Sequence, residues 1–199
     1  MNRFYRNVRA CVTPFAKGLF RFEVTGVENF SKNSNLIICC NHQSFWDVVL
    51  LAVACPFQIN FMAKKELFKN KIIGWIFTKA GAFPVNRGAG DVNAIKKAHD
   101  ALNGGILGIF PEGTRNPLGP PQKAKAGAAM LAIDTGADIQ PVAIRYSGHP
   151  LLFRKVSVRI GEIIDGGSFV NSEAVSKSEI RRVTSMIMES ITKLWEKEF

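Results

Sequence analysis

A histidine and an aspartate five residues apart are the side chains whose types and spacing most clearly indicate chemistry. His42 and Asp47 lie in the segment NHQSFWD, residues 41–47, which directly follows the apolar run Leu36–Cys40. On one continuous helix this gap would turn the two side chains about 140° apart. They can meet if His42 lies in a turn and Asp47 in the first turn of the next helix. A carboxylate that holds one imidazole nitrogen orients the ring, which suits a general base.

Other interpretations of this segment remain open. Ser44 can be a helix N-cap with Asp47 as the carboxylate of a capping box, and His42 can be a hydrogen-bonded turn residue. A nucleophilic enzyme is less favoured, because Ser44 has no GxSxG context and nothing besides His42 supports a reactive Cys40. A metal site that includes Cys39 lacks a second close-spaced ligand pair. If His42 is catalytic, we expect it to activate a hydroxyl group of the substrate.

Three other segments place charged side chains at the predicted ends of strands. The segment FPEGTRN, residues 110–116, forms a turn through its proline and glycine, and its candidate site residues are Glu112, Gly113, Thr114 and Arg115. Arg87 follows the apolar run at 82–85, and Lys64 follows the run at 59–63. A guanidinium group is well suited to phosphate. Each segment alone can equally be a solvated loop, but together they predict an anion-binding edge beside His42.

Short apolar runs alternate with helical patterns along the chain. The predicted strands are Leu36–Cys40, Ile59–Ala63, Ala82–Val85, Ile106–Phe110, Ile139–Ile144 and Val156–Ile160. The predicted helices are Phe45–Ala54, Ile72–Lys79, Val92–Leu102, Lys125–Thr135 and a final helix from Ser178, preceded by Ser176 and Glu179 at capping-box spacing. This alternation predicts an α/β fold with a mostly parallel central sheet flanked by helices. In such sheets, sites gather where strands end and helices begin.

The composition indicates one basic, globular domain. Among 199 residues there are 26 Lys and Arg against 16 Asp and Glu, and the hydrophobic share of 47% excludes a disordered chain. A net charge of +10 predicts an anionic partner. Most of the phenylalanines lie inside apolar runs, so a base-stacking surface and a nucleic-acid partner are not expected. The four cysteines have no CxxC spacing, which favours reduced, buried thiols.

The first 21 residues form a separate basic segment. It contains Arg3, Arg6, Arg9, Lys17 and Arg21 and no acidic residue. The apolar residues Phe4, Val8, Val12 and Phe15 follow a helical stripe, and Pro14 is expected to end or kink the helix. Such a helix is typical of a membrane-surface anchor, although the stripe can also pack on the protein's own core. We expect residues 1–21 to be this segment and 22–199 to be the main domain. No run reaches the ~20 apolar residues that a transmembrane helix needs.

In these segments the sequence resembles the glycerolipid acyltransferases, most closely the bacterial 1-acyl-sn-glycerol-3-phosphate (lysophosphatidate) acyltransferases. The family's four blocks occur in the family's order. They are Asn-His-x4-Asp at Asn41, His42 and Asp47, an arginine block at 81–88, Phe-Pro-Glu-Gly-Thr-Arg at 110–115, and a proline block at 139–144. The segment Ala63-Lys64-x-Glu66-Leu67 matches a further family segment, and the resemblance covers about residues 20–165.

The resemblance implies the family's α/β domain and the transfer of a fatty acyl group from a thioester to the free hydroxyl of lysophosphatidate, giving phosphatidate in phospholipid biosynthesis. The roles it implies are general base for His42, orientation of that base for Asp47, phosphate binding for Lys64, Arg87 and Arg115, glycerol binding for Glu112, and an oxyanion hole near Gly113. It implies no metal and no organic cofactor. The expected partners are acyl-CoA or acyl carrier protein and an anionic membrane surface, with the protein peripheral on the cytoplasmic face.

The sequence departs from the family's pattern at two positions. Asn86 stands where many members have Asp, which we expect to be tolerated, and Ala124 stands where the Phe-Lys-x-Gly segment has Phe. The acceptor also stays open, since glycerol-3-phosphate or another lysophospholipid would suit the same motifs. A basic membrane-binding module without catalysis is a further alternative. The intact His42, Asp47 and Glu112 argue against it.

Overall fold

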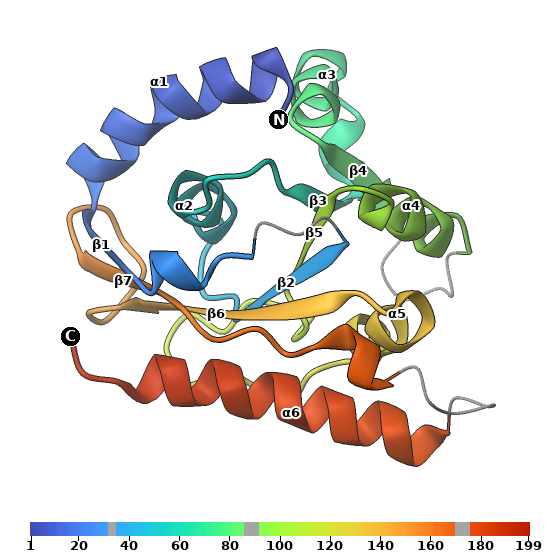
Figure 1. The fold of residues 1–199 in the computed structure, drawn as a ribbon. Coiled ribbons are helices and arrows are strands. Elements are labelled where there is room, and N and C mark those ends of the chain that lie inside the picture. The colour runs from blue at the N-terminus through green and yellow to red at the C-terminus, as the bar shows by residue number, and fades with distance from the viewer. Residues whose placement is uncertain (32–34, 86–91, 170–175) are drawn as a thin grey trace.

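The computed structural model describes residues 1–31, 35–85, 92–169 and 176–199 (Figure 1). The strands are β1 Arg21–Thr25, β2 Leu36–Cys40, β3 Asn60–Lys64, β4 Ala82–Val85, β5 Ile106–Ile109, β6 Asp138–Tyr146 and β7 Lys155–Ile160. The helices are α1 Arg3–Leu19, α2 Asp47–Ala54, α3 Lys71–Lys79, α4 Val92–Leu102, α5 Gly127–Thr135 and α6 Lys177–Glu196, with short 3-10 turns η1 Val27–Asn29, η2 Lys65–Phe68 and η3 Gly166–Phe169.

The seven strands form one sheet in the order β1-β7-β6-β2-β5-β3-β4. Every neighbouring pair is parallel except β6 with β7. The predicted α/β fold with a mostly parallel sheet is therefore confirmed. Because β2, β5, β3 and β4 are parallel neighbours, the segments that follow them leave the sheet at the same edge.

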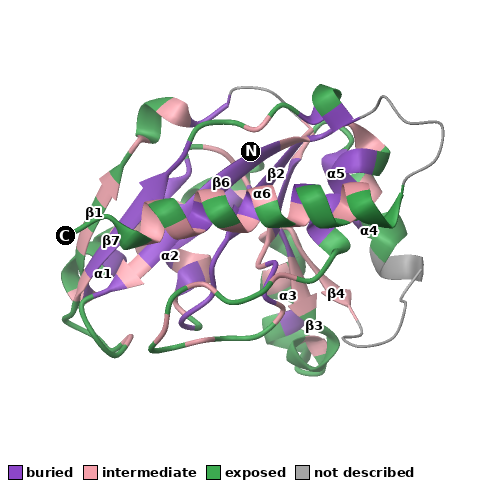
Figure 2. Cartoon of the chain, turned by 90° about the horizontal axis from the view of Figure 1, so that it is seen from below, coloured by how far each residue is buried: buried purple, intermediate pink, exposed green. Residues whose placement is uncertain are grey.

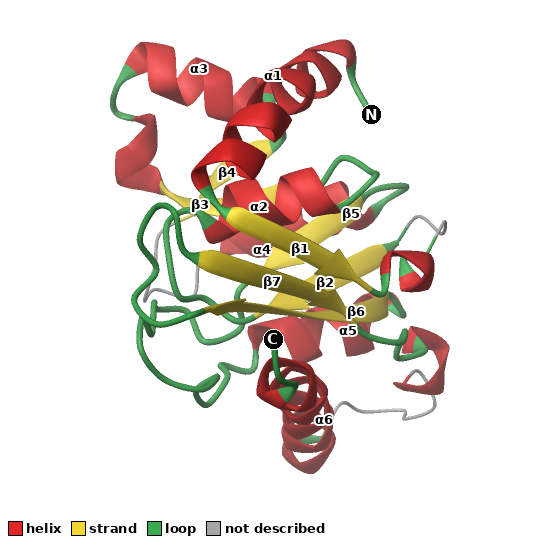
Figure 3. Cartoon of the chain, turned by 90° about the vertical axis from the view of Figure 1, so that its left-hand side faces the viewer, coloured by secondary structure: helices red, strands yellow, loops and turns green. Residues whose placement is uncertain are grey.

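Strand β2 lies in the middle of the sheet and is buried on both faces. Leu36, Ile38 and Cys40 belong to one core cluster, and Ile37 and Cys39 belong to the other. Alternate side chains of a strand point to opposite faces, so a continuous apolar run is what a doubly covered strand requires. Helices α1, α2 and α3 cover one side of the sheet, and α5 and α6 cover the other (Figures 1 and 3).

Helix α6 packs as its sequence pattern predicts. Val183, Ile187 and Ile191 are buried, and the rest of the helix is partly buried or exposed (Figure 2). Ser176 is the N-cap, and its Oγ accepts a hydrogen bond from the Glu179 N–H at 3.0 Å. The predicted capping position is therefore correct, although the Glu179 side chain pairs with Arg182.

Helix α1 does not end at Pro14, which was one of the two effects expected of this proline. The helix continues through Pro14 to Leu19, so proline neither ends it nor marks its boundary. Pro14 is exposed, whereas Val12 and Ala16 on either side of it pack against the core. Packing of both turns compensates for the hydrogen bond that proline cannot make.

The buried face of α1 is also rotated from the predicted stripe. Tyr5 and Ala16 are buried, while Phe15 is 69% exposed. On the same inner side, the Arg9 guanidinium donates hydrogen bonds to the carbonyls of Ala52 (3.0 Å) and Val53 (2.9 Å) at the end of α2. A cation is stabilising at a helix C-terminus, so Arg9 supports α2 instead of facing solvent. None of the helices in the described part of the chain is both long enough and apolar enough to cross a bilayer.

Candidate active site

The turn that follows β2 is tied to strand β6 by one side chain. Asn41 Nδ2 donates to the Ile144 carbonyl at 2.9 Å, and Asn41 Oδ1 accepts from the Ile144 N–H at 2.8 Å. The side-chain amide thus continues the β2–β6 ladder for one more step. As a result, the chain leaves the sheet at His42, at the carboxyl end of the central strand.

His42 and Asp47 contact each other directly. The distance from His42 Nδ1 to Asp47 Oδ2 is 2.9 Å. Asp47 is the first residue of α2, and His42 lies in the turn before it. This is the arrangement under which a five-residue gap brings the two side chains together. His42 is 8% exposed and Asp47 is fully buried, so the pair is shielded but His42 retains a small opening to solvent.

The Asp47 carboxylate has a capping role as well. Its Oδ2 accepts hydrogen bonds from the Gln43 N–H (2.6 Å) and the Ser44 N–H (2.7 Å). Trp46 occupies the N-cap position, so the prediction that Ser44 is the N-cap is wrong. The reason is the extra turn formed at residues 45–46, which moves the helix start to Asp47. The two interpretations were not exclusive, because one carboxylate both holds this turn and contacts the imidazole.

A tyrosine that the sequence analysis missed completes the contacts of Asp47. The Tyr146 hydroxyl donates to Asp47 Oδ1 at 2.8 Å and comes from the end of β6. Burial, followed by the nearby Asp47 charge, raises the pKa of Tyr146 far above its usual range, so the hydroxyl keeps its proton. The available signal was position: Tyr146 is one of two tyrosines and lies just beyond a predicted strand.

These contacts determine which imidazole nitrogen carries the proton. Asp47 accepts from two backbone N–H groups and one hydroxyl, as an ionised carboxylate does. In a neutral imidazole the shared hydrogen is therefore assigned to His42 Nδ1, which leaves the Nε2 lone pair free. The Phe110 ring stacks on the imidazole with centroids 4.1 Å apart and the planes inclined by 22°, which fixes the orientation of the ring.

Glu112 supports His42 from the loop that follows β5. Its Oε1 accepts from the His42 backbone N–H at 2.8 Å, and its Oε2 accepts from the Gln122 N–H at 3.0 Å. Burial raises the pKa of the Glu112 carboxyl, while these two hydrogen bonds act in the opposite direction. The Asn116 N–H also donates to the His42 carbonyl at 2.8 Å. Both backbone groups of His42 are thus held by this loop.

The loop turns at Gly113, where a side chain would not fit easily. The φ angle of Gly113 is +69°, in the left-handed region that favours glycine. A Cβ at this position would lie 2.9 Å from Cε of the flexible Lys125 side chain, so the backbone conformation is the stronger constraint. Lys125 is attached to the loop by its own N–H, which donates to the Pro111 carbonyl at 2.8 Å. Lys125 is therefore a second residue of this site that the sequence analysis did not assign.

Two of the three predicted cations, Lys64 and Arg115, are among the described residues, and both are exposed. Lys64 ends β3, and its Nζ is 3.5 Å from Glu66 Oε1 on the surface. Thr114 and Arg115 are exposed in the loop after β5. Among the described residues, no carboxylate forms an ion pair with Arg115, so its guanidinium is open to an anion. Arg87 lies outside the described residues, and its predicted role stays a prediction.

The alternative nucleophiles gain no support from the geometry. Burial raises the pKa of the Cys40 thiol well above its ordinary value, and the Asp47 and Glu112 charges add to the shift. A thiol that stays protonated is a poor nucleophile. Ser44 Oγ accepts from the Trp46 N–H at 3.3 Å, within the turn. Over the described ranges, no cluster of three or more possible metal ligands occurs.

Comparison with known proteins agrees with this geometry. Residues 21–145 match the model of the acyltransferase family. The chain belongs to this family. It is 34% identical to the 1-acyl-sn-glycerol-3-phosphate acyltransferase of Bacillus subtilis over 99% of this chain and 98% of that protein. The crystal structure of the 1-acyl-sn-glycerophosphate acyltransferase PlsC from Thermotoga maritima superposes with a TM-score of 0.73 at 26% identity, covering 98% of this chain and 83% of that one.

A third relative bears on the choice of acceptor. The lyso-ornithine lipid O-acyltransferase of Pseudomonas aeruginosa is 34% identical over 63% of this chain and 48% of that protein.

The acyltransferase region at 21–145 includes His42, Asp47 and Glu112, whereas Tyr146 lies one residue beyond it. For an acyltransferase, an oriented imidazole with a free Nε2 can take a proton from a hydroxyl group as that group attacks a thioester.

Proposed function

We propose that this acyltransferase transfers a fatty acyl group from an acyl thioester to the free hydroxyl of 1-acyl-sn-glycerol-3-phosphate, giving phosphatidate. The observation that carries the proposal is the His42–Asp47 contact of 2.9 Å beside the Phe110–Arg115 loop. The contact orients His42 as a base for the acceptor hydroxyl. The loop supplies the guanidinium of Arg115 for the acceptor phosphate at the same edge of the sheet. The relatives named for this reaction match nearly the whole chain.

His42 acts as general base and then as general acid in this proposal. Nε2 removes the proton of the acceptor hydroxyl while its oxygen attacks the thioester carbonyl. The tetrahedral intermediate then breaks its carbon–sulfur bond, and the protonated imidazole gives the proton to the leaving thiolate. Asp47 holds Nδ1 throughout and stabilises the imidazolium. No acyl-enzyme is required, which suits the protonated state of Cys40.

In this proposal the remaining predicted residues contact the phosphate and glycerol parts of the acceptor and the oxyanion of the tetrahedral intermediate. Arg115, Arg87 and Lys64 contact the acceptor phosphate. The Gly113 N–H is already donated to the Phe110 carbonyl at 3.0 Å, so the oxyanion hole is assigned to the N–H groups that follow it, at Thr114 and Arg115. Glu112 contacts the glycerol part only secondarily, because both of its oxygens accept backbone hydrogen bonds.

The proposed acyl donor and membrane location are based on the net charge of the protein. We propose that the donor is acyl-CoA or acyl carrier protein, both of which are anionic and suit a chain of net charge +10. The enzyme acts as a peripheral protein on the cytoplasmic face of an anionic membrane, in phospholipid biosynthesis. The proposed reaction uses neither a metal nor an organic cofactor, because proton transfer by His42 and hydrogen bonding are sufficient for it.

One alternative acceptor has a specific observation in its favour. The Pseudomonas relative named for lyso-ornithine lipid is as identical to this chain as the Bacillus relative is, although over a shorter length. The catalytic pair would serve any hydroxyl acceptor, so the anion-binding edge decides between them. A role as a non-catalytic membrane-binding module is disfavoured by the intact contacts of His42.

The test is a transfer assay that crosses acceptors with donors. Purified protein receives lysophosphatidate, glycerol-3-phosphate or lyso-ornithine lipid, each with acyl-CoA and with acyl carrier protein, and thiol release and lipid product are measured. We expect phosphatidate from lysophosphatidate with at least one donor. Faster transfer to lyso-ornithine lipid would show that this lipid, and not lysophosphatidate, is the preferred acceptor. No transfer to any acceptor would refute catalysis.

A further inference from the structure

Helix α3 carries an apolar stripe that faces away from the protein. Ile72 is 73% exposed, Trp75 is 54% exposed and Ile76 is 37% exposed. These positions follow the i, i+3, i+4 spacing of a single helix face. A surface helix normally turns such a stripe toward the core, and large contiguous apolar patches mark interaction sites.

The opposite face of α3 is the one that packs. Gly74 is buried, and a Cβ there would lie 3.0 Å from the Phe68 carbonyl oxygen, so the helix lies directly on η2. Phe77 adds an edge-to-face contact with Phe68, with ring centroids 6.0 Å apart. The Ile72–Trp75–Ile76 stripe is therefore held outward by close packing behind it.

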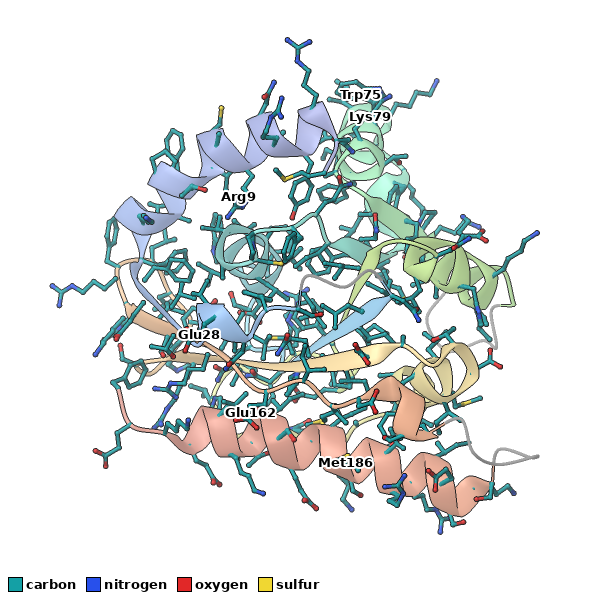
Figure 4. The ribbon with its side chains drawn as sticks, viewed as in Figure 1. Arg9, Glu28, Trp75, Lys79, Glu162 and Met186 are labelled. Atoms are coloured by element: carbon teal, nitrogen blue, oxygen red, sulfur yellow. The ribbon has the colours of Figure 1, made fainter. Side chains whose placement is uncertain are left out.

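Helix α1 joins α3 in one continuous surface. The Phe4 ring meets the Trp75 ring edge to face at 5.4 Å, and Asn2 Nδ2 donates to the Lys79 carbonyl at 3.1 Å. Trp75 and Lys79 lie at the outer end of this surface, whereas Arg9 points inward from α1 (Figure 4).

Lysines are frequent in the segment that contains the apolar stripe. Residues 64–79 contain five lysines, Lys64, Lys65, Lys69, Lys71 and Lys79, and a single acid, Glu66. The first turn of α3 also follows η2, which begins where β3 ends, at the sheet edge that carries His42. The stripe and the candidate active site are thus linked by one short segment of chain.

We propose that the outer face of α3, together with the exposed flank of α1, docks on the surface of an anionic lipid bilayer. The proposal rests on the proposed function, because it explains how a lipid acceptor reaches a site on a protein with no spanning helix among its described residues. Lysines beside isoleucine and tryptophan suit an interfacial amphipathic helix. Protein–protein interfaces are depleted in lysine, which disfavours a second copy or an acidic protein as the occupant.

The test compares two double variants by vesicle flotation. Ile72→Gln/Ile76→Gln removes the apolar stripe and leaves Trp75 on Phe4. Ile95→Gln/Met130→Gln is the matched control, because Ile95 and Met130 are 49% exposed and lie on other helices, α4 and α5. With phosphatidylglycerol vesicles, we expect the α3 pair to lower partitioning at least tenfold and the control pair to bind like the unchanged protein.

Two further measurements sharpen the assignment. Vesicles with brominated acyl chains should quench part of the tryptophan fluorescence, and Trp75→Phe should lose that quenching while still binding. Lys69→Gln/Lys71→Gln should weaken binding by about fivefold per lysine at low salt, and less at high salt.

Three results would overturn the docking surface: equal vesicle binding by the α3 pair and the unchanged protein, an equal loss in both pairs, or a dimer in sedimentation that the α3 pair dissociates. A separate assay, which does not depend on membrane binding, tests the proposed function. A short-chain, monomeric lysophosphatidate should be acylated equally by the unchanged protein and both pairs. If none of them acylates it, the activity is refuted and flotation still decides the docking question.

Discussion

The orientation of one imidazole depends on three contacts that come from two segments, the start of α2 and the loop after β5. Asp47 holds Nδ1, Phe110 covers the ring, and Glu112 holds the backbone N–H of His42. Each contact restricts either the rotation of the His42 side chain or the conformation of the turn that carries it. A base held in this way needs little reorganisation when the substrate binds, which is the property that preorganised sites share.

Replacement of His42 tests the base. We expect His42→Ala to lower the transfer rate by ~10²–10⁴-fold, as loss of a general base usually does, with an unchanged circular dichroism spectrum. Asp47→Asn should reduce the rate by a similar or smaller factor. A rate for His42→Ala above about a tenth of normal would contradict the assignment. If Asp47→Asn mainly lowers the melting temperature, the capping role of Asp47 is the dominant one.

Tyr146 is a positioning residue, because it acts through Asp47. Tyr146→Phe keeps the buried ring and removes one hydrogen bond to a charged group, a contact of about 1.5–3 kcal/mol. We expect kcat to fall roughly tenfold or more with KM nearly unchanged, because the lower end of this range corresponds to about a factor of ten. A Tyr146→Phe variant with unaltered kcat and a lower melting temperature would assign Tyr146 to stability alone.

Arg115 should act on the phosphate of the acceptor. Arg115→Ala removes a charge-assisted contact of ~1.5–3 kcal/mol, which corresponds to a loss of roughly 10–150-fold in kcat/KM. The measurement compares lysophosphatidate with an acceptor that lacks the phosphate, using Arg182→Ala on α6 as a control. Equal losses with both acceptors would exclude phosphate binding by Arg115.

At the scale of elements, the site depends on strands that are buried on both faces. Burial raises the pKa of Cys39 in β2 to about 12 and that of Cys55 after α2 to about 11. A raised thiol pKa means that the unreactive protonated form dominates at neutral pH, and it persists until the pH rises through the shifted value. The exposed Cys11 differs from these buried thiols.

A thiol titration tests this burial. At pH 8 we expect a disulfide reagent to modify Cys11 rapidly in the native protein, and the other three cysteines only after unfolding. Cys11→Ser should abolish the fast phase. Rapid modification of two or more thiols in native Cys11→Ser would show that the sheet opens near the active site.

At the scale of the whole molecule, α1 is part of the folded core. Its inner face packs against the core cluster, and Arg9 holds the last carbonyls of α2. Because α2 begins at Asp47, the support of α2 by α1 extends to the His42–Asp47 contact. Residues 1–21 therefore stabilise the domain as well as carrying basic charge.

Removal of α1 tests this coupling. Deletion of residues 1–15 should lower the melting temperature and reduce transfer to both membrane-embedded and detergent-dispersed acceptors. Arg9→Met is the milder form, and we expect it to cost about 1–2 kcal/mol of stability through the end of α2. An unchanged melting temperature, with a loss restricted to membrane-embedded acceptor, would instead make α1 purely a membrane anchor.

The sequence alone determined six of the strands, the mostly parallel sheet and the edge at which the site lies, whereas β1 Arg21–Thr25 was not predicted. These follow from local periodicity: a run such as Leu36–Cys40 has few ways to be buried other than as a central strand. The same local information predicted His42 and Asp47, because they are close along the chain. It also predicted Glu112, through a segment that matches the family's pattern.

Only the tertiary structure decided which distant residues complete the site. Tyr146 is 99 positions from Asp47, and Lys125 reaches Gly113 across a loop. Such contacts depend on strand order and register, which a linear pattern does not specify. The outward face of α3 and the inward face of α1 were decided in the same way. Periodicity shows that a helix has an apolar face, but only packing shows whether that face meets the core or the surroundings.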